Sequence, residues 1–338
     1  MTEQALIGSS ATLCRPCYGW GAQLMNRFCL AMLSLVALSG AAPAPEAISL
    51  PGDHLHPESV SITPDGMAYV GSMFGGVLKV DLRTRTVTRW VAPGAYGSGA
   101  LFGVLADLRH HIVWTCTNDF PGSTLSVAGA DPGHWLKGFD LATGNGRVSL
   151  RLPGEKPVCN DMAVGRDGSL YVTDTGQPRI LRWRPGATAL EVWLEDTTFN
   201  PPGKVGGLDG IAVGADGALY VNNVRSGALY RVTIGPDGKA GKVTPLALSR
   251  PLASPDGMRP LGGADFLLAE GKGTISRFTV VGDRAEITTL ATGINQPTGV
   301  GTALGSGWYV QGQLSAIFRP ADSTADLPFR LTPVALRP

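Results

Sequence analysis

The sequence predicts an all-β fold, a six-bladed β-propeller. The first observation behind this prediction is a frame in which one residue is followed, seven positions later, by Asp-Gly and then by an apolar strand. The clearest copies run from Glu58 to Asp65, from Asn160 to Asp167 and from Asp209 to Asp216. Asp-Gly between two alternating apolar runs is a strong signal for a β-hairpin. One hairpin therefore recurs along the chain.

The second observation is the spacing of the copies. The frame opens at positions 58, 103, 160, 209, 256 and 298, which are 45, 57, 49, 47 and 42 residues apart. A period of about 40–50 residues with four short strands per unit is typical of a β-propeller. After the N-terminal segment, no stretch has the pattern of a long amphipathic helix. Six blades therefore account for the rest of the chain.

Each copy is expected to contribute an inner hairpin and then two outer strands. The second strands of the hairpins are expected at Met67–Val70, Val113–Thr115, Leu170–Val172, Leu219–Val221, Phe266–Leu268 and Trp308–Val310. The outer pairs are expected at Gly76–Leu82 with Thr86–Val91, Arg179–Trp183 with Leu190–Leu194, Ala228–Ile234 with Lys242–Leu248, and Thr274–Val280 with Ala285–Ala291. Either Ala47–Leu50 or Phe329–Leu336 would supply the outer strand that ties the first blade to the last.

The composition limits the classes of partner. Charged residues make up 16% of the 338 residues, the formal net charge is +1, and the 46 glycines suit a chain of tight hairpins. A basic stripe with interleaved aromatic residues does not occur, so we expect no nucleic-acid binding. We expect one propeller domain over residues 43–338, and a monomer.

The N-terminal segment has the pattern of a secretory signal. Arg27 precedes the apolar stretch Phe28–Leu38, and small residues follow at 39–42 before a proline-rich join. We therefore expect residues 25–42 to be a signal peptide, residues 1–24 to be a doubtful extension, and the protein to be periplasmic or secreted without a membrane segment after cleavage. The alternative is that residues 1–24 are genuine and that Phe28–Leu38 anchors the chain in a membrane.

Two of the five cysteines fall in the expected domain. Cys116 ends a strand of the second blade, and Cys159 directly precedes the first position of the third blade. Both would lie at the same rim on neighbouring blades. In an oxidising compartment they would form a disulfide; the alternative is a pair of buried free thiols.

Four of the six first positions carry a carboxylate or carboxamide side chain, and a ring of blades would bring them together at the axis. They are Glu58, Asn160, Asp209 and Asp256. Hard oxygen ligands favour Ca²⁺, with Mg²⁺ and Mn²⁺ as alternatives, and are less suited to Zn²⁺. Three carboxylates without an ion would repel one another. The alternative is that these residues only form turns.

Further residues are candidates for the wall of a substrate pocket. Phe102 would lie near the axis and favours a less polar substrate, although it is equally suited to packing. Asp174, Asn223 and Glu270 end second strands and would face the same rim. The alternative for these three is hydrogen bonding at the end of a hairpin.

Several segments resemble the SMP-30/gluconolactonase/luciferin-regenerating-enzyme-like family over roughly residues 50–320. They are Glu58-Ser59, Asn160-Asp161, Leu208–Gly210 and Pro255–Met258, placed on six repeats. The resemblance implies a propeller with a catalytic divalent metal, usually Ca²⁺, held by Glu58, Asn160, Asp209 and Asp256. It also favours Asp256 as the base or nucleophile.

Two positions depart from the pattern of that family. Asp209 stands where the family usually has Asn, which keeps an oxygen ligand and adds a negative charge. Val158 stands where the gluconolactonase branch has a sugar-binding Arg, so a sugar lactone is not specifically indicated.

Two functions follow as hypotheses. The first is an exported metal-dependent hydrolase of small-molecule lactones or related esters, in which the ion polarises the carbonyl group and Asp256 or Asp209 takes a proton or attacks. The second is a non-enzymatic propeller that binds a partner and uses the metal as a structural element.

Overall fold

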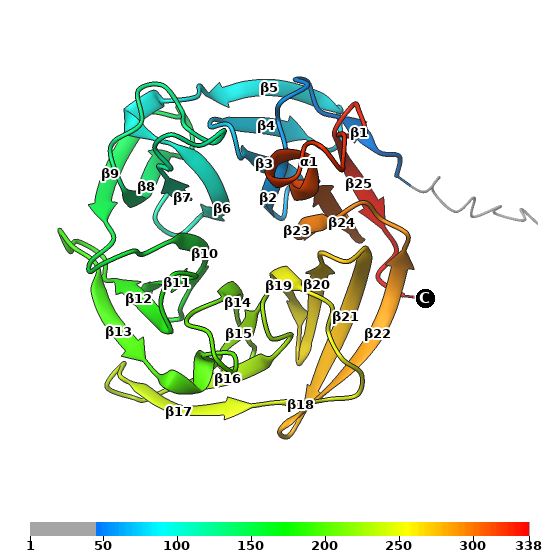
Figure 1. Ribbon diagram of the computed structural model, residues 1–338. Coiled ribbons are helices and arrows are strands. Elements are labelled where there is room, and N and C mark those ends of the chain that lie inside the picture. Colours follow the sequence, from blue (N-terminus) through cyan, green and yellow to red (C-terminus); the bar gives the residue numbers. More distant parts are fainter. Residues whose placement is uncertain (1–44, 338) are drawn as a thin grey trace, which may run out of the picture. The chain divides into compact units, whose positions relative to one another are not determined.

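Six antiparallel sheets surround a central axis in the computed structural model of the protein, which describes residues 45–337 (Figure 1). This arrangement confirms the predicted all-β six-bladed propeller. The expected signal peptide at 25–42 and the extension at 1–24 lie outside the described residues. Within residues 45–337, the structure has no helix of the length and apolarity needed to span a membrane.

The blades follow one another in chain order, each with its innermost strand first. Blade 1 consists of β2 (Pro57–Ile62), β3 (Met67–Ser72), β4 (Val77–Asp81) and β5 (Thr86–Val91). Blade 2 consists of β6 (Ala100–Asp107), β7 (Ile112–Asn118), β8 (His134–Asp140) and β9 (Gly146–Arg151). Blade 3 consists of β10 (Cys159–Val164), β11 (Leu170–Asp174), β12 (Arg179–Trp183) and β13 (Glu191–Glu195).

The second half of the ring repeats the plan. Blade 4 consists of β14 (Leu208–Val213), β15 (Leu219–Asn223), β16 (Leu229–Ile234) and β17 (Ala240–Pro245). Blade 5 consists of β19 (Pro255–Gly262), β20 (Asp265–Glu270), β21 (Thr274–Val281) and β22 (Arg284–Thr292), with the short β18 (Ala247–Leu248) parallel to its edge. Blade 6 consists of β23 (Pro297–Ala303), β24 (Ser306–Gln311), β25 (Arg330–Val334) and β1 (Ile48–Ser49).

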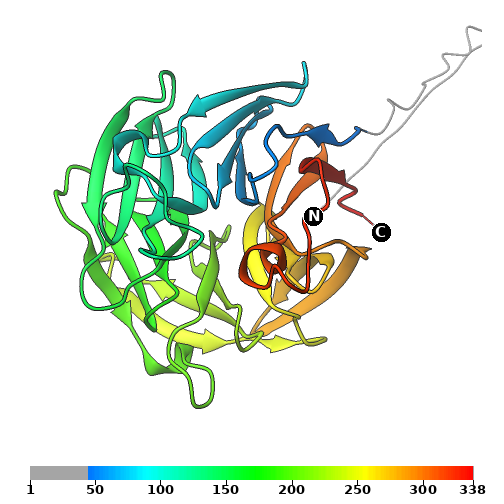
Figure 2. The same ribbon diagram turned by 45° about the horizontal axis from the view of Figure 1, so that its top comes forward.

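In the described part of the chain, three short helical segments occur in the connections. They are η1 (Ala95–Gly97), η2 (Thr197–Phe199) and α1 (Leu314–Phe318). The connections that contain them join strands at the end of the ring where the innermost strands begin. Figure 2 shows α1 on the connection between β24 and β25.

Both candidate segments take part in ring closure. The sixth blade has three strands from the end of the chain, and the N-terminal β1 adds the fourth, with Ile48 opposite Leu331 and Ser49 opposite Arg330. The two segments pair with each other because an unpaired sheet edge would leave backbone groups without partners. The two predicted alternatives are therefore two halves of one closure.

The apolar core lies between neighbouring blades. Trp114 of blade 2 packs against Trp183 of blade 3 with ring centroids 4.9 Å apart, and Tyr220 of blade 4 packs against Phe266 of blade 5 at 4.7 Å. Because each inner strand is covered on both faces, β11 is buried along its whole length. Burial on both faces explains why the second strands read as continuous apolar runs.

The predicted pair of cysteines forms a disulfide. Cys116 in β7 is bonded to Cys159 in β10, with their Cα atoms 5.0 Å apart. The bond joins blades 2 and 3, and both residues are fully buried. Of the two alternatives, the structure therefore has the disulfide and not a pair of free thiols.

Every innermost strand has a bulge at the same place. The pairing of each with its neighbour shifts directly after Pro57, Leu101, Cys159, Leu208, Pro255 and Pro297. A bulge inserts one extra residue and redirects a side chain. The residues that follow the six shifts are Glu58, Phe102, Asn160, Asp209, Asp256 and Thr298.

This register corrects one of the six predicted first positions. In blade 2 the equivalent residue is Phe102 and not Gly103. The sequence frame is weak there because blade 2 has no Asp-Gly turn to fix its register. The other five first positions fall where the frame placed them.

Glycine after the first position allows neighbouring inner strands to approach closely. A Cβ atom on Gly210 would lie 2.3 Å from the carbonyl oxygen of Asp256, and one on Gly257 would lie 2.7 Å from the carbonyl oxygen of Thr298. Such contacts are shorter than van der Waals separations. The glycines that follow Asp209 and Asp256 are therefore required by the packing of blades 4, 5 and 6.

Candidate active site

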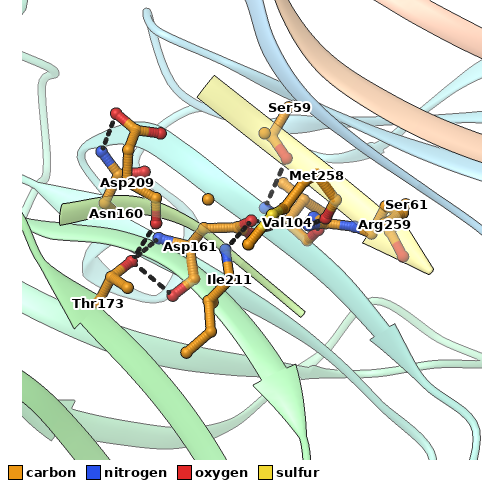
Figure 3. A network of polar contacts seen from close by, with 12 residues as sticks. Ser59, Ser61, Val104, Asn160, Asp161, Thr173, Asp209, Ile211, Met258 and Arg259 are labelled. Atoms are coloured by element: carbon orange, nitrogen blue, oxygen red, sulfur yellow. Dashed lines mark hydrogen bonds and ion pairs between the residues drawn. The ribbon is translucent and has the colours of Figure 1, made fainter. Parts of the chain in front are cut away.

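Four predicted ligands lie on the innermost strands of four blades. Glu58 belongs to β2, Asn160 to β10, Asp209 to β14 and Asp256 to β19, and their exposed fractions are 7%, 5%, 6% and 8%. The Nδ2 atom of Asn160 donates to Oδ2 of Asp209 over 3.2 Å, although the residues are 49 positions apart (Figure 3). The ring therefore brings at least these two side chains together at its axis.

The three carboxyl groups have raised pKa values, for which burial is the largest cause. Burial, and then the charges of Asp209 and Asp161, raise the pKa of Glu58 well above its usual value. Burial, followed by Asp161, raises the pKa of Asp209 to about 7. Burial, followed by the charges of Asp209 and Glu58, raises the pKa of Asp256 well above its usual value. The charge of Asp209 thus raises the pKa of both other carboxyl groups, and the charge of Glu58 raises that of Asp256.

Two oxygen atoms of this group are available to a cation. Among the described residues, Oδ1 of Asp209 is buried without a hydrogen-bond partner. Asn160 uses its amide nitrogen twice, donating to Thr175 Oγ1 over 2.8 Å and to Asp209. Both amide hydrogens are engaged, so the amide oxygen is the atom that remains for a ligand.

The donor set fits a hard divalent cation. Two Asp, one Glu and one Asn offer only oxygen atoms, and the orphaned Asp209 oxygen needs a partner. Across residues 45–337, no three His, Cys, Asp or Glu side chains are gathered into a ready-made metal cluster. The residue types therefore fit, and an ion would have to draw their oxygens together.

The backbone that carries Asn160 is held from both sides. The disulfide fixes Cys159, and Asn118 holds the backbone of Cys159 by accepting from its nitrogen over 3.0 Å and donating to its oxygen over 2.9 Å. Thr175, which accepts from Asn160, donates in turn to the carbonyl oxygen of Leu208 over 2.6 Å. The positions of Asn160 and Asp209 are thus coupled through a common partner.

The predicted pocket residues Asp174, Asn223 and Glu270 are fully buried and hold loops. Asp174 accepts from the backbone nitrogen of Val158 over 2.8 Å, and Glu270 accepts from that of Ala253 over 2.8 Å. Asn223 donates to the carbonyl oxygen of Gly206 over 3.1 Å. Each bond fixes the segment two or three residues before a candidate ligand. Such contacts are what the alternative, hydrogen bonding at the end of a hairpin, predicts. None of the three side chains is exposed at the surface as part of a pocket wall.

Phe102 takes the first position in blade 2 and packs in an apolar cluster. Its ring lies 5.8 Å from that of Phe120, which follows β7, and Leu314 of α1 belongs to the same cluster. Phe102 is half-buried. Blade 2 thus presents an aromatic ring at the position where blades 1, 3, 4 and 5 present oxygen atoms.

Arg259 is a residue of this region that the sequence reasoning missed. It forms an ion pair with Asp161, the residue after Asn160 (Figure 3). The sequence does contain a signal for Arg259. It lies three residues after Asp256, and the residues at the equivalent position of the other five blades are uncharged.

A cavity of about 630 Å³ lies away from these residues. Leu261, Asp265 and Ser306 line it, at the end of blades 5 and 6 where the inner hairpins turn. The candidate ligands begin the innermost strands, at the opposite end. The cavity is therefore separate from the candidate active site.

No family model and no curated protein matches this chain. Among solved structures, it is similar to a protein assigned as a gluconolactonase, with 13% identity, a TM-score of 0.61, and 86% of this chain and 93% of that chain covered. It is similar to regucalcin from Agrobacterium tumefaciens, described as a calcium-binding protein, with 13% identity, a TM-score of 0.58, and 86% and 95% covered.

A third solved structure belongs to another kind of enzyme. Virginiamycin B lyase from Staphylococcus aureus is 17% identical, with a TM-score of 0.55, and 85% of this chain and 83% of that chain are covered. At identities this low, a likeness shows the fold alone. The three comparisons therefore establish that this chain shares its propeller fold with proteins of differing activity.

Proposed function

We propose that the protein is a metal-dependent hydrolase of lactones or related esters. The observation that carries this proposal is the group of four oxygen-bearing side chains from four blades, in which Asp209 has a buried, unpartnered oxygen. The likeness to proteins assigned as a gluconolactonase and as a calcium-binding regucalcin supports it at the level of the fold. The substrate would be a small molecule, and the protein would act as a monomer.

Glu58, Asn160, Asp209 and Asp256 are the residues that would hold the ion. Ca²⁺ suits these oxygen ligands, with Mg²⁺ and Mn²⁺ as alternatives. When bound, such an ion supplies a Lewis acid that polarises the carbonyl group and stabilises its developing negative charge. The buried position of the four side chains excludes bulk water and strengthens that interaction.

Asp256 is the carboxylate that we assign to proton transfer. Its Oδ1 atom accepts from the backbone nitrogen of Gly257 over 2.8 Å, which orients the group and leaves the second oxygen for the proton of an attacking water. Asp209 neighbours Asp256 and is the second candidate. The net reaction adds water across the ester bond and releases a hydroxy acid from a lactone, or a carboxylic acid and an alcohol from an open-chain ester.

Export of the protein belongs to the same proposal. The disulfide between Cys116 and Cys159 supports a periplasmic or secreted location, because disulfides persist in oxidising compartments. The pattern of residues 25–42 supports it as well.

A second candidate function is a propeller that binds a partner and uses the ion to hold its ring together. The observation that favours it is the burial of the four side chains, each of which is at least nine-tenths covered. An ion enclosed in this way would be well placed to hold the ring and poorly placed to reach a substrate.

One experiment separates the two functions. We would measure the metal content of the purified protein and assay aliphatic, aromatic and sugar lactones on the same sample, using Glu58→Gln, Asp256→Asn and the exposed control Glu155→Gln. We expect one Ca²⁺ per chain, lost in Glu58→Gln and kept in Glu155→Gln, and turnover that Asp256→Asn abolishes. Metal without turnover of any lactone would favour the binding propeller, and a metal-free protein would contradict both.

A further inference from the structure

One ion pair joins the innermost strands of blades 3 and 5, beside Asn160 and Asp209 (Figure 3). Arg259 of β19 donates from Nη1 to Asp161 Oδ2 over 2.6 Å and from Nη2 to Asp161 Oδ1 over 3.0 Å. The pair is therefore bidentate, the geometry in which Arg binds a carboxylate most strongly. Its side chains are 11% and 4% exposed, so water screens the pair little.

The contacts of the pair reach several blades. Arg259 also donates to the carbonyl oxygen of Val104 over 3.3 Å, and Asp161 accepts from the backbone nitrogen of Ile211 over 3.4 Å. These bonds link blades 2, 3, 4 and 5. The backbone nitrogen of Val104 donates to Oγ of Ser59 over 3.2 Å, which extends the network to blade 1.

The contact between Arg259 and Val104 locates the pair on the axis. In a ring of six blades, the second and the fifth stand opposite each other. A side chain of β19 that reaches the backbone of β6 must therefore cross the centre. Asp161 is one residue after Asn160 in β10, and Arg259 is three residues after Asp256 in β19. The pair therefore lies next to the candidate ligands, on the side of the hairpin turns.

Arg259 and Asp161 are the charged residues at their positions in the six blades. Arg259 is three residues after the first position of its blade, and the equivalent residues are Ser61, Leu105, Ala163, Ala212 and Gly301. Asp161 is one residue after the first position, and the equivalent residues are Ser59, Gly103, Gly210, Gly257 and Gly299. One cation and one anion thus occupy layers that are otherwise uncharged.

We propose that the pair between Arg259 and Asp161 is a built-in staple, which holds the inner strands together across the axis without a divalent ion. A buried pair in this position replaces the crosslink that a structural metal would supply. An ion bound by Glu58, Asn160, Asp209 and Asp256 is then not needed for folding. This inference goes beyond the proposed hydrolase function, since it concerns what stabilises the ring.

The test is urea unfolding of the full chain in EDTA, combined with calorimetric titration of Ca²⁺. The variants are Arg259→Met, Asp161→Leu and the double variant. The matched control is Arg277→Met, because Arg277 pairs with Asp265 at the same 2.6 Å but within blade 5 and partly exposed to water.

We expect the unmodified protein to remain folded in EDTA, with a cooperative transition. Each single variant at the pair should raise the unfolding equilibrium constant about 100-fold or more, because it leaves a buried charge without a partner. The double variant should lose much less free energy of unfolding than the sum of the losses in the two single variants, since it removes both charges. Arg277→Met should change the constant by less than about tenfold.

Two results would overturn the staple. One is unfolding of the unmodified protein in EDTA and its recovery with Ca²⁺, which would make the ion the crosslink. The other is full additivity: a loss of unfolding free energy in the double variant equal to the sum of the losses in the two single variants would show that the two residues are not coupled. The proposed function fails separately, through the absence of lactone turnover in a folded, Ca²⁺-loaded protein.

Discussion

The side chains of Asn160 and Asp209 are joined by a 3.2 Å hydrogen bond between the third and fourth blades. Each residue is the first one within the bulge of its innermost strand. The bond shows how the propeller builds a site: a local irregularity repeated in every blade redirects one side chain, and closure of the ring brings these side chains together.

Thr175 should control the metal affinity of this pair. Its Oγ1 accepts from Asn160 and donates to the carbonyl oxygen of Leu208, so it orients the amide next to Asp209. Thr175→Val keeps the shape and removes both bonds. We expect Ca²⁺ affinity to fall about 10–100-fold, the usual effect of losing a group that orients a metal ligand. Calorimetric titration measures it, with the exposed Thr88→Val as a control, and equal affinity in the two variants would contradict the prediction.

Phe102 should determine the preference among substrates. It occupies the first position of blade 2 beside the oxygen-bearing positions, and its ring packs with Phe120. Phe102→Ala should lower kcat/KM about tenfold or more for lactones with long apolar substituents, and less for small lactones. The exposed Leu108→Ala is the control. An equal loss for small and large lactones would show that Phe102 only supports the fold.

The disulfide between Cys116 and Cys159 should stabilise the ring strongly. It closes a loop of 43 residues between two blades, and a loop of this length corresponds to about 4 kcal/mol in the chain-entropy model. The double variant Cys116→Ala/Cys159→Ala should therefore unfold at a clearly lower urea concentration. A midpoint equal to that of the parent protein would mean that the bond is absent in solution.

His134 should make the protein less stable in mild acid. Burial lowers the pKa of His134, and this effect exceeds those of Asp174 and Asp119, which raise the pKa. A group with a lowered pKa stabilises the fold above its unfolded pKa of about 6.5, and this contribution is lost as the pH falls through its folded pKa. We expect the melting temperature to fall between pH 7 and pH 5.

The variant His134→Gln isolates this contribution. The Gln side chain can still donate to Oδ1 of Asn118, as Nδ1 of His134 does over 2.8 Å, but it does not titrate. Its melting temperature should depend less on pH than that of the parent protein. The exposed His111→Gln should retain the parent profile, and the same profile in all three proteins would contradict the assignment to His134.

The sequence predicted the parts of the fold that have local signals. Asp-Gly turns at Asp65, Asp167 and Asp216 mark the inner hairpins, and their period sets the number of blades. The frame also identified Glu58, Asn160, Asp209 and Asp256, because a repeated hairpin places equivalent residues at equivalent points. It misplaced the first position of blade 2 by one residue, since no Asp-Gly turn fixes that strand.

The sequence by itself thus determined the propeller, its six blades and the four carboxylate or carboxamide side chains that share one position. Only the tertiary structure decided that Cys116 bonds to Cys159, that Asp174 and Glu270 hold loops, and that Arg259 reaches Asp161 over 98 residues of sequence. The physical reason is the range of the interactions. Turns and strand patterns depend on neighbouring residues, whereas contacts across the axis exist only once the ring has closed.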